Sequence, residues 1–307
     1  FGYTRSTSKY RLNVNKNMNM RNVNAALDAV RSPTTGQIVC RVSLTAYASL
    51  YPGCAPLNVF GPSAESKEAI DYIYTRAYHI TTNTLDDWTG SVTGSPFSTS
   101  AGPVEVAVSG ELRSQSYKLF SNSLPSEVQD CAGIRFNCTP GVSTANINQF
   151  ASRSEVNQKT YEAAAEINVP LLKDAPFADS FLINGAVRVT DYSNSGTVVT
   201  WKGGVDWDIN SQLTFRGTRS RDIRAPNLTE LYGTRSVTPA GPPLDLHIGQ
   251  TPPGIVSFIT DSNPNLTPEI ATTWTAGVVF RPVWIPRFSL AIDWYKISIK
   301  DAIANVQ

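Results

Sequence analysis

The sequence contains few of the residues on which enzymes and nucleic-acid-binding proteins depend. Only two of its 307 residues are histidines, and 26 basic side chains are balanced by 25 acidic ones, for a net charge of +1. This balance excludes the basic surface that nucleic-acid-binding proteins need. The motifs Gly-x-Ser-x-Gly and His-Glu-x-x-His and a phosphate-binding Gly-rich loop are also absent. We therefore expect no enzymatic activity, no cofactor, no metal and no nucleic-acid partner.

Long hydrophobic runs are missing as well. No stretch approaches the roughly 20 apolar residues that a transmembrane helix needs. Any membrane-spanning part must therefore consist of strands, which cross a bilayer in about 9–11 residues. The chain starts at Phe1 without a Met or a signal sequence and ends at Gln307 in a polar stretch. We interpret residues 1–307 as an internal part of a longer protein.

Cysteine is scarce, and the four cysteines form two close pairs. Cys40 and Cys54 are one pair and Cys131 and Cys138 the other, each in a segment rich in Gly, Pro, Asn and Ser. A zinc site is the alternative, but the spacings and the two histidines fit it poorly. We predict two local disulfides, each stabilising the fold by at most about 3 kcal/mol, and hence an oxidising compartment.

What the sequence does contain is apolar alternation with a period of two. In residues 199–208 one face carries Val199, Trp201, Gly203, Val205 and Trp207, and the other carries Thr200, Lys202, Gly204, Asp206 and Asp208. Such a strand needs an apolar medium on one side and water on the other. A β-sandwich provides this with a second sheet, whereas a membrane barrel turns the apolar face to lipid and keeps the polar face around a wet lumen.

The lengths of the connections favour the barrel. Nine strands are predicted, near residues 10–15, 78–88, 104–113, 161–169, 181–190, 199–208, 213–216, 270–281 and 288–294. The even-numbered connections are short (93–103, 170–178, 209–212 and 282–287), and three odd-numbered ones are long (16–77, 118–157 and 222–268), with only 193–196 tight. An up-and-down barrel has short periplasmic turns at one end and long extracellular loops at the other. A sandwich has no reason to separate its loops in this way.

Aromatic residues near the predicted strand ends agree with a membrane barrel. They are Trp88, Trp201, Trp207, Trp284, Trp294, Tyr192 and Tyr295. A ring with a polar edge suits the headgroup region of a bilayer. The alternative is that they are ordinary core aromatics.

Two motifs resemble a known family. The first runs from Arg224 to Tyr232 and reads Arg-Ala-Pro-Asn-Leu-Thr-Glu-Leu-Tyr, and the second is Asn263-Pro-Asn-Leu-Thr-Pro-Glu269. Both are similar to signatures in the barrel domain of TonB-dependent outer-membrane receptors, with weaker echoes at 101–113 and 289–299. The motif residues are Arg224, Pro226, Asn227, Glu230, Asn263, Pro264, Pro268 and Glu269. Pro226 is expected to fix the backbone, and Asn227 to cap a short helix over 228–232.

The resemblance implies an all-β, antiparallel, up-and-down transmembrane barrel in the bacterial outer membrane. Residues 1–307 would be the central portion of a 22-stranded wall, without the plug domain, the TonB-contacting segment or the closing strands. The expected partners are outer-membrane lipid, the plug domain, TonB and a small-molecule nutrient. That nutrient would be siderophore-iron, an oligosaccharide or a corrin-like cofactor. A passive porin and a secreted carbohydrate-binding β-sandwich are the alternatives.

Candidate ligand-binding residues come from the long loops and from one arginine-rich stretch. Tyr47, Tyr51, Tyr232 and His247 could stack on sugars or contact an iron chelate, with Tyr72 and Tyr74 as further candidates unless they pack a helical loop segment over 66–77. Arg216, Arg219, Arg221 and Arg224 could bind carboxylates or phosphates bidentately. They could equally pair with Asp206, Asp208, Asp222 and Glu230 within the wall.

Overall fold

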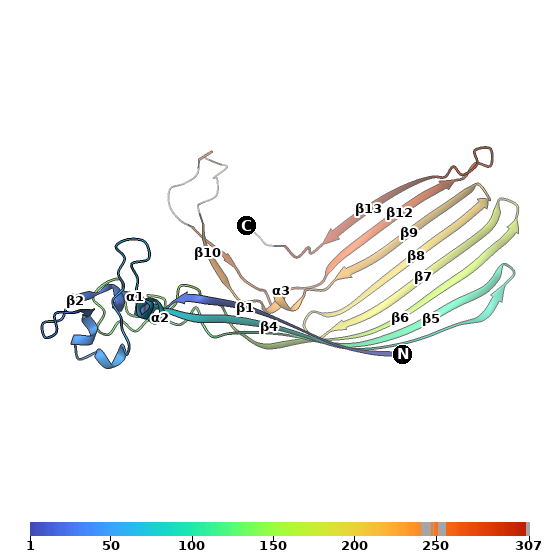
Figure 1. Cartoon of the computed structure of the whole chain (residues 1–307). Helices are drawn as coiled ribbons and strands as arrows, with labels where there is room; N and C mark the ends of the chain where they lie inside the picture. The colour runs from blue at the N-terminus through green and yellow to red at the C-terminus, as the bar shows by residue number, and fades with distance from the viewer. Residues whose placement is uncertain (241–246, 248, 251–255, 305–307) are drawn as a thin grey trace. The chain divides into compact units, whose positions relative to one another are not determined.

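Nine antiparallel strands form one sheet in which neighbours along the chain are neighbours in space. The computed structural model describes residues 1–240, 247, 249, 250 and 256–304. The strand order is β1-β4-β5-β6-β7-β8-β9-β12-β13, a meander that Figure 1 shows. The strands are β1 (Gly2–Met18), β4 (Tyr74–Thr99), β5 (Gly102–Ser121), β6 (Arg153–Ala175), β7 (Ala178–Tyr192), β8 (Gly196–Asn210), β9 (Leu213–Arg224), β12 (Glu269–Phe280) and β13 (Leu290–Lys300).

The connections confirm the predicted separation by length. The even-numbered ones are 100–101, 176–177, 211–212 and 281–289, whereas the odd-numbered ones are 19–73, 122–152, 193–195 and 225–268. In an antiparallel meander the three long connections therefore leave the sheet at one end, together with the tight turn 193–195, and the even-numbered connections lie at the other end. A single sheet in sequential order is not the pair of packed sheets that a sandwich requires.

Several strands are longer than the alternation predicts. β4 has 26 residues and β6 has 23, so the short connections predicted over 93–103 and 170–178 shrink to two residues each. In the β4 extension small and polar residues interrupt the alternation, and in the β6 extension Leu171 and Leu172 follow one another at a register shift between Pro170 and Leu172. The period of two is therefore lost while the backbone ladder continues. The helical segment predicted over 66–77 is also shorter in the structure. α2 (Lys67–Ile73) ends where β4 begins at Tyr74, because β4 extends further toward the N-terminus than predicted.

The chain divides into two compact units. One comprises Phe1–Thr7, Asn83–Tyr117 and Val156–Gln307, and the other Ser8–Thr82 and Lys118–Glu155. The division falls within β1, β4, β5 and β6. In the described residues, no helix is both long and apolar enough to cross a membrane.

In the first unit the register separates an apolar face of the sheet from a polar one. Phe181, Trp207 and Phe215 are cross-strand neighbours, and ring centroids lie 6.1 Å apart for Phe181 and Trp207 and 6.0 Å for Trp207 and Phe215. On the opposite face Asp208 accepts hydrogen bonds from Ser180 Oγ (2.7 Å) and Thr214 Oγ1 (2.6 Å). The predicted faces of β8 are therefore confirmed.

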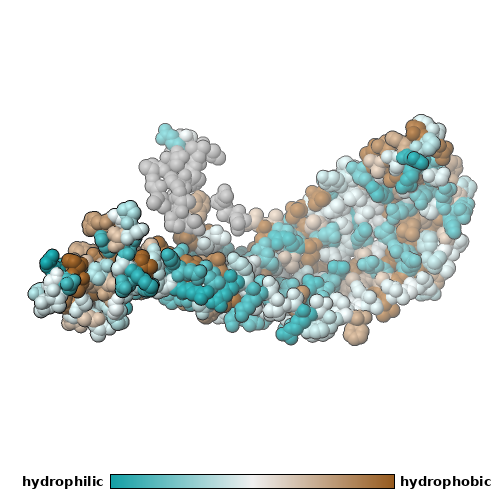
Figure 2. Space-filling view, in the orientation of Figure 1, coloured by the Kyte–Doolittle hydropathy of each residue, from teal (hydrophilic) through white to brown (hydrophobic). Residues whose placement is uncertain are grey.

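Large apolar side chains on this face and at the short turns are exposed. Trp201 is 37% exposed and Trp294 57%. The turn between β12 and β13 carries Val283, Trp284 and Ile285, which are 71%, 71% and 38% exposed. Figure 2 shows hydrophobic residues gathered at this end of the sheet. The prediction was wrong for Tyr192 and Tyr295, because the register places both on the polar face. A residue next to Trp294 on a strand cannot share its face.

The second unit contains the connections 19–73 and 122–152. Its elements are α1 (Met20–Leu27), β2 (Ala29–Arg31), β3 (Ile38–Cys40), the 3₁₀ turns η1 (Arg41–Leu44) and η2 (Ala48–Leu50), and α2. Asn19 and Ser66 cap α1 and α2 by accepting from backbone amides of the first turn. The small core consists of Ala25, Cys40, Val42 and Tyr51, with Cys54 and Ile134 packed against it.

Candidate functional site

Arg224, at the end of β9, joins the two sequence motifs. Its guanidinium donates to Glu269 through Nε (2.9 Å to Oε2) and Nη2 (3.0 Å to Oε1). Nη1 donates to both carboxylate oxygens of Glu230, at 2.9 and 3.1 Å. Because Glu269 opens β12 and Glu230 lies in α3 (Leu228–Tyr232), one arginine ties two strands to the helix between them.

The predicted cap of α3 is confirmed. The Asn227 side chain accepts from the backbone amides of Thr229 and Glu230, both at 2.9 Å. Glu230 Oε2 in turn accepts from the Asn227 amide at 2.7 Å, which completes a capping box. Glu230 thus completes the capping box of α3 and also forms the ion pair with Arg224.

The second motif is held against the end of α3. The Asn263 amide donates to the carbonyl of Glu230 (2.9 Å), and Ser262 Oγ donates to that of Gly233 (2.8 Å). At Gly233 an added Cβ would lie 2.5 Å from the Thr229 carbonyl oxygen, so this close approach requires glycine. The two motifs are one structural unit, and the described contacts of Arg224 favour the wall-network interpretation over ligand binding. The loop continues into the hairpin β10 (Ser236–Ala240) and β11 (Val256–Thr260).

Arg216 forms a second bidentate ion pair on the polar face. Its Nε and Nη2 donate to the Asp293 carboxylate at 2.9 and 2.7 Å. The two residues reach each other across Gly277, which lies between them in the register. A Cβ at Gly277 would fall 2.1 Å from Asp293 Oδ1, so the glycine makes room for the pair.

The arginines pair with carboxylates that the sequence did not suggest. Of the four partners proposed, Glu230 forms an ion pair with Arg224, and Asp206 lies directly opposite Arg216 in the register, within range of its charge. Asp208 is held by hydroxyls instead, and Asp222 accepts from Ser220 Oγ (2.6 Å). Asp293 and Glu269 lie 77 and 45 residues from their arginines. Only the strand register brings them together, and a single sequence does not show it.

The four arginines do not form one site. Arg216 and Arg224 lie on the polar face, whereas Arg219 and Arg221 lie at odd positions of β9 and share the face of Trp201. The Arg219 guanidinium lies 4.5 Å from the ring centroid of Trp274 and 5.5 Å from that of Trp201. Arginines that are close in the sequence therefore lie on both faces of the sheet, because neighbouring strand residues point to opposite sides.

The tyrosines of the first long loop have different environments. Tyr51 is 3% exposed and its hydroxyl donates to the Ala132 carbonyl, with the Arg21 guanidinium 4.4 Å from its ring centroid. These contacts favour a packing role for Tyr51. Tyr47, the N-cap residue of η2, is 47% exposed.

The remaining tyrosines and the histidine are spread over other elements. Tyr72 lies in α2, where burial raises the pKa of its hydroxyl to about 12. Tyr74 begins β4, with Lys16 Nζ 5.8 Å from its ring centroid. Tyr232 is the half-buried last residue of α3, and His247 is an exposed turn residue.

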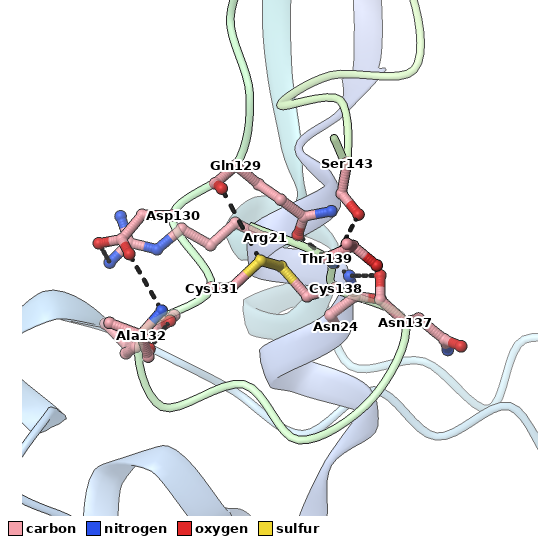
Figure 3. Close-up of a disulfide and its surroundings, with 11 residues drawn as sticks. Arg21, Asn24, Gln129, Asp130, Cys131, Ala132, Asn137, Cys138, Thr139 and Ser143 are labelled. Atoms are coloured by element: carbon pink, nitrogen blue, oxygen red, sulfur yellow. Dashed lines mark hydrogen bonds and ion pairs between the residues drawn. A yellow bond between two sulfur atoms is a disulfide. The ribbon is translucent and has the colours of Figure 1, made fainter. Parts of the chain in front are cut away.

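Both predicted disulfides are confirmed. Cys40 bonds to Cys54 and Cys131 to Cys138. Figure 3 shows the second bridge beside Asn24 of α1, whose side-chain amide donates to Gln129 Oε1 and to the Asn137 carbonyl, both at 3.1 Å. The connections 19–73 and 122–152 thus each carry a cross-link, and buried polar contacts hold these two loops together.

A buried carboxylate adds to this junction between the loops. Asp28, whose side chain is 4% exposed, accepts from Arg41 Nε at 2.8 Å and from Arg135 Nε at 2.9 Å. The hydrogen bonds from Arg135, followed by those from Arg41, hold the pKa of the Asp28 carboxyl below its usual range, against the opposing effect of burial. The sequence singled out neither Asp28 nor these arginines, because nothing local marks the contact.

The described residues show no metal centre. Among them, no group of three or more His, Cys, Asp or Glu side chains lies close enough to hold a metal ion. What the arrangement offers is an exposed loop surface on a cross-linked frame and a polar sheet face with paired charges.

The family model for the TonB-dependent receptor-like β-barrel matches residues 5–307. The chain belongs to this family. TonB-dependent receptors are β-barrels of the bacterial outer membrane, so the apolar face of the sheet is the lipid side and the polar face the lumen side. No curated protein matches the chain.

Three solved receptors are similar to this TonB-dependent receptor chain. PirA from Acinetobacter baumannii, a siderophore receptor, is 18% identical with a TM-score of 0.45, over 74% of this chain and 28% of that one. PirA from Pseudomonas aeruginosa is 14% identical with a TM-score of 0.44, over 73% and 35%. A mutant of the ferric enterobactin receptor PfeA from Pseudomonas aeruginosa, in complex with enterobactin, is 14% identical with a TM-score of 0.48, over 81% and 38%. The chain spans about a third of the length of these receptors.

Proposed function

We propose that this chain supplies part of the wall and the capturing loops of a receptor that imports a scarce, bulky nutrient across the outer membrane, with energy supplied through TonB. The family match over residues 5–307 carries the proposal. The coupling itself is assigned to the plug domain and the TonB-contacting segment of the full-length protein, since no residue of this chain is proposed to perform it.

The architecture of the long loops supports capture. Two disulfides and the Asp28 ion pairs form a preorganised frame, and a rigid frame lowers the entropic cost of ordering a binding surface. On this frame Tyr47 is 47% exposed and Phe60, which the sequence did not single out, is 88% exposed. Exposed rings on a fixed loop are suited to stacking against a flat or aromatic ligand.

Ferric siderophores are the first substrate class to test, and oligosaccharides and corrin-like cofactors are the others. PirA and PfeA are named for siderophores. We expect a strain lacking the full-length gene to lose growth on at least one defined ferric siderophore, and the wild-type gene to restore growth only when TonB is functional. Restored growth without TonB would contradict energy coupling and favour a passive porin.

The loop surface is tested with a matched pair of substitutions. Tyr47→Ala should raise the ligand concentration that gives half-maximal uptake several-fold, because one stacked ring contributes about 1 kcal/mol. Tyr161→Ala is the control: Tyr161 is 50% exposed but lies on the lipid face of β6. Equal effects of the two substitutions would remove Tyr47 from the proposed site.

A further inference from the structure

The lipid face of β8, β9, β12 and β13 changes character along the strands. Toward the short turns the lateral rows are apolar: one row is Trp207, Phe215, Val278 and Ile292, and the next is Val205, Gly217, Ala276 and Trp294. Toward the long loops the rows become cationic: one is Gly203, Arg219, Trp274 and Lys296, the next Trp201, Arg221, Thr272 and Ser298, and a third contains Ile223, Ile270 and Lys300. We call Arg219, Arg221, Lys296 and Lys300 the cationic rim.

Carboxylates are missing from this part of the face. On the four strands, whose residues are all described, no lipid-face position is Asp or Glu. In the described structure the carboxylate partners of β9 arginines lie elsewhere: Asp293 and Glu269 are on the polar face, and Glu230 is in α3. On the neighbouring strand β7, Asp191 lies on the lipid face and accepts from the Thr197 hydroxyl. The cationic rim therefore has charge to offer an external anion.

Two tryptophans fix the height of the rim relative to the bilayer. Trp201 and Trp274 are 37% and 45% exposed, and indoles on a lipid-facing surface settle at the headgroup level. Arg219 lies over both rings and is itself exposed. Its aliphatic stem can cover apolar surface while the guanidinium extends into the polar layer. The rim thus begins where the hydrocarbon ends.

We propose that the cationic rim binds the phosphate-bearing headgroup of an outer-leaflet lipid. Guanidinium groups match phosphate oxygens with two parallel hydrogen bonds, and ammonium groups add charge. Arg219 and Arg221 form the centre, since both lie on an interior strand with neighbours on each side. The stacking of Arg219 on two indoles holds its guanidinium ready for the phosphate, and the apolar rows below accept the acyl chains. This inference follows from the barrel's orientation in the membrane and does not depend on the transported nutrient.

The test uses the full-length receptor in nanodiscs of neutral lipid with a small fraction of a phosphorylated lipid. Native mass spectrometry or a binding titration measures how much of that lipid the protein retains. We expect the Arg219→Gln/Arg221→Gln double variant to bind it roughly 30-fold more weakly, from about 1 kcal/mol per cation. Lys202→Gln, which removes a cation from the lumen face beside Ser220, should bind normally.

Four outcomes would overturn the proposal. Undiminished retention by the double variant would show that the rim does not hold the lipid. An equal loss in Lys202→Gln would show a diffuse charge effect. Equal retention of the dephosphorylated lipid, or displacement of the lipid by millimolar inorganic phosphate alone, would show that a lipid headgroup is not the specific ligand. Far-UV circular dichroism of each variant verifies that the barrel has folded.

Discussion

At the scale of single residues, this receptor wall depends on glycines and carboxylates whose partners are far away in the sequence. Position 277 requires glycine, because the Arg216–Asp293 ion pair fills the space that a side chain there would need. Asp28 is buried between two arginines that come from different loops. Neither role can be read from local sequence, since both depend on the register and on loop packing.

Gly277→Ala should lower the unfolding midpoint of the full-length protein. The added methyl would displace the Asp293 carboxylate and break its bidentate hydrogen bonds to Arg216. The decreases in unfolding midpoint caused by Gly277→Ala and by Asp293→Asn should therefore not add in the double variant. Gly203→Ala is the matched control, because no atom lies within 4 Å of a Cβ at Gly203. Thermal unfolding in detergent compares the variants, and identical midpoints for the two alanine variants would contradict the role assigned to Gly277.

Asp28 should make the loop unit sensitive to acid. Its folded-state pKa is lowered, so its stabilising contribution is complete above the unfolded pKa of about 3.9 and is lost as the pH falls through the lower, folded pKa. The protection factors of residues 19–73 and 122–152, which correct the exchange rate for the intrinsic effect of pH, should therefore fall below about pH 4. Asp28→Asn should accelerate exchange at neutral pH and lose this acid-dependent part. A variant with the wild-type pH profile would refute the assignment.

At the scale of elements, the sequence predicted the features formed by residues close together in the chain. It did not predict the features formed by residues far apart in the chain. Asn227 followed by Glu230 predicted the capped helix α3, and two close cysteine pairs predicted both disulfides, because these features involve residues near one another. The period of two located all nine strands. It missed the ends of β4 and β6, where the alternation is interrupted, and it could not assign Tyr51 to a core that two loops build together.

The cap of α3 should be measurable by substitution. Asn227→Ala removes the acceptor of two amide hydrogen bonds and should destabilise the loop over 225–268 by about 1 kcal/mol. Asn227→Ser retains an acceptor and should cost much less. The rate of limited proteolysis within this loop reports the difference, and similar rates for the two variants would show that the cap is not what orders it.

At the scale of the whole molecule, the alternating lengths of the connections and the two-faced strands led to a membrane barrel before any contact was known. The nine-stranded meander and the family match agree with that interpretation. The identity of the transported nutrient depends on side chains that meet only in the folded loops. Tyr47 is exposed and Tyr51 is buried, so residue type alone did not show which tyrosine a ligand could reach.

The orientation of the apolar face is tested most directly by placing a charge on each side of the sheet. Val205 lies on the lipid face, and Thr218, beside Gly204 in the register, lies on the polar face. Gly204 itself is unsuitable as the control, because a Cβ there would lie 2.6 Å from Asn184 Oδ1. The free energy of unfolding of the full-length protein is measured in lipid bilayers. Val205→Arg should lower it by about 2–4 kcal/mol near the bilayer midplane and Thr218→Arg by much less, whereas the reverse order would mean that hydrocarbon does not contact the face of Trp201 and Trp207.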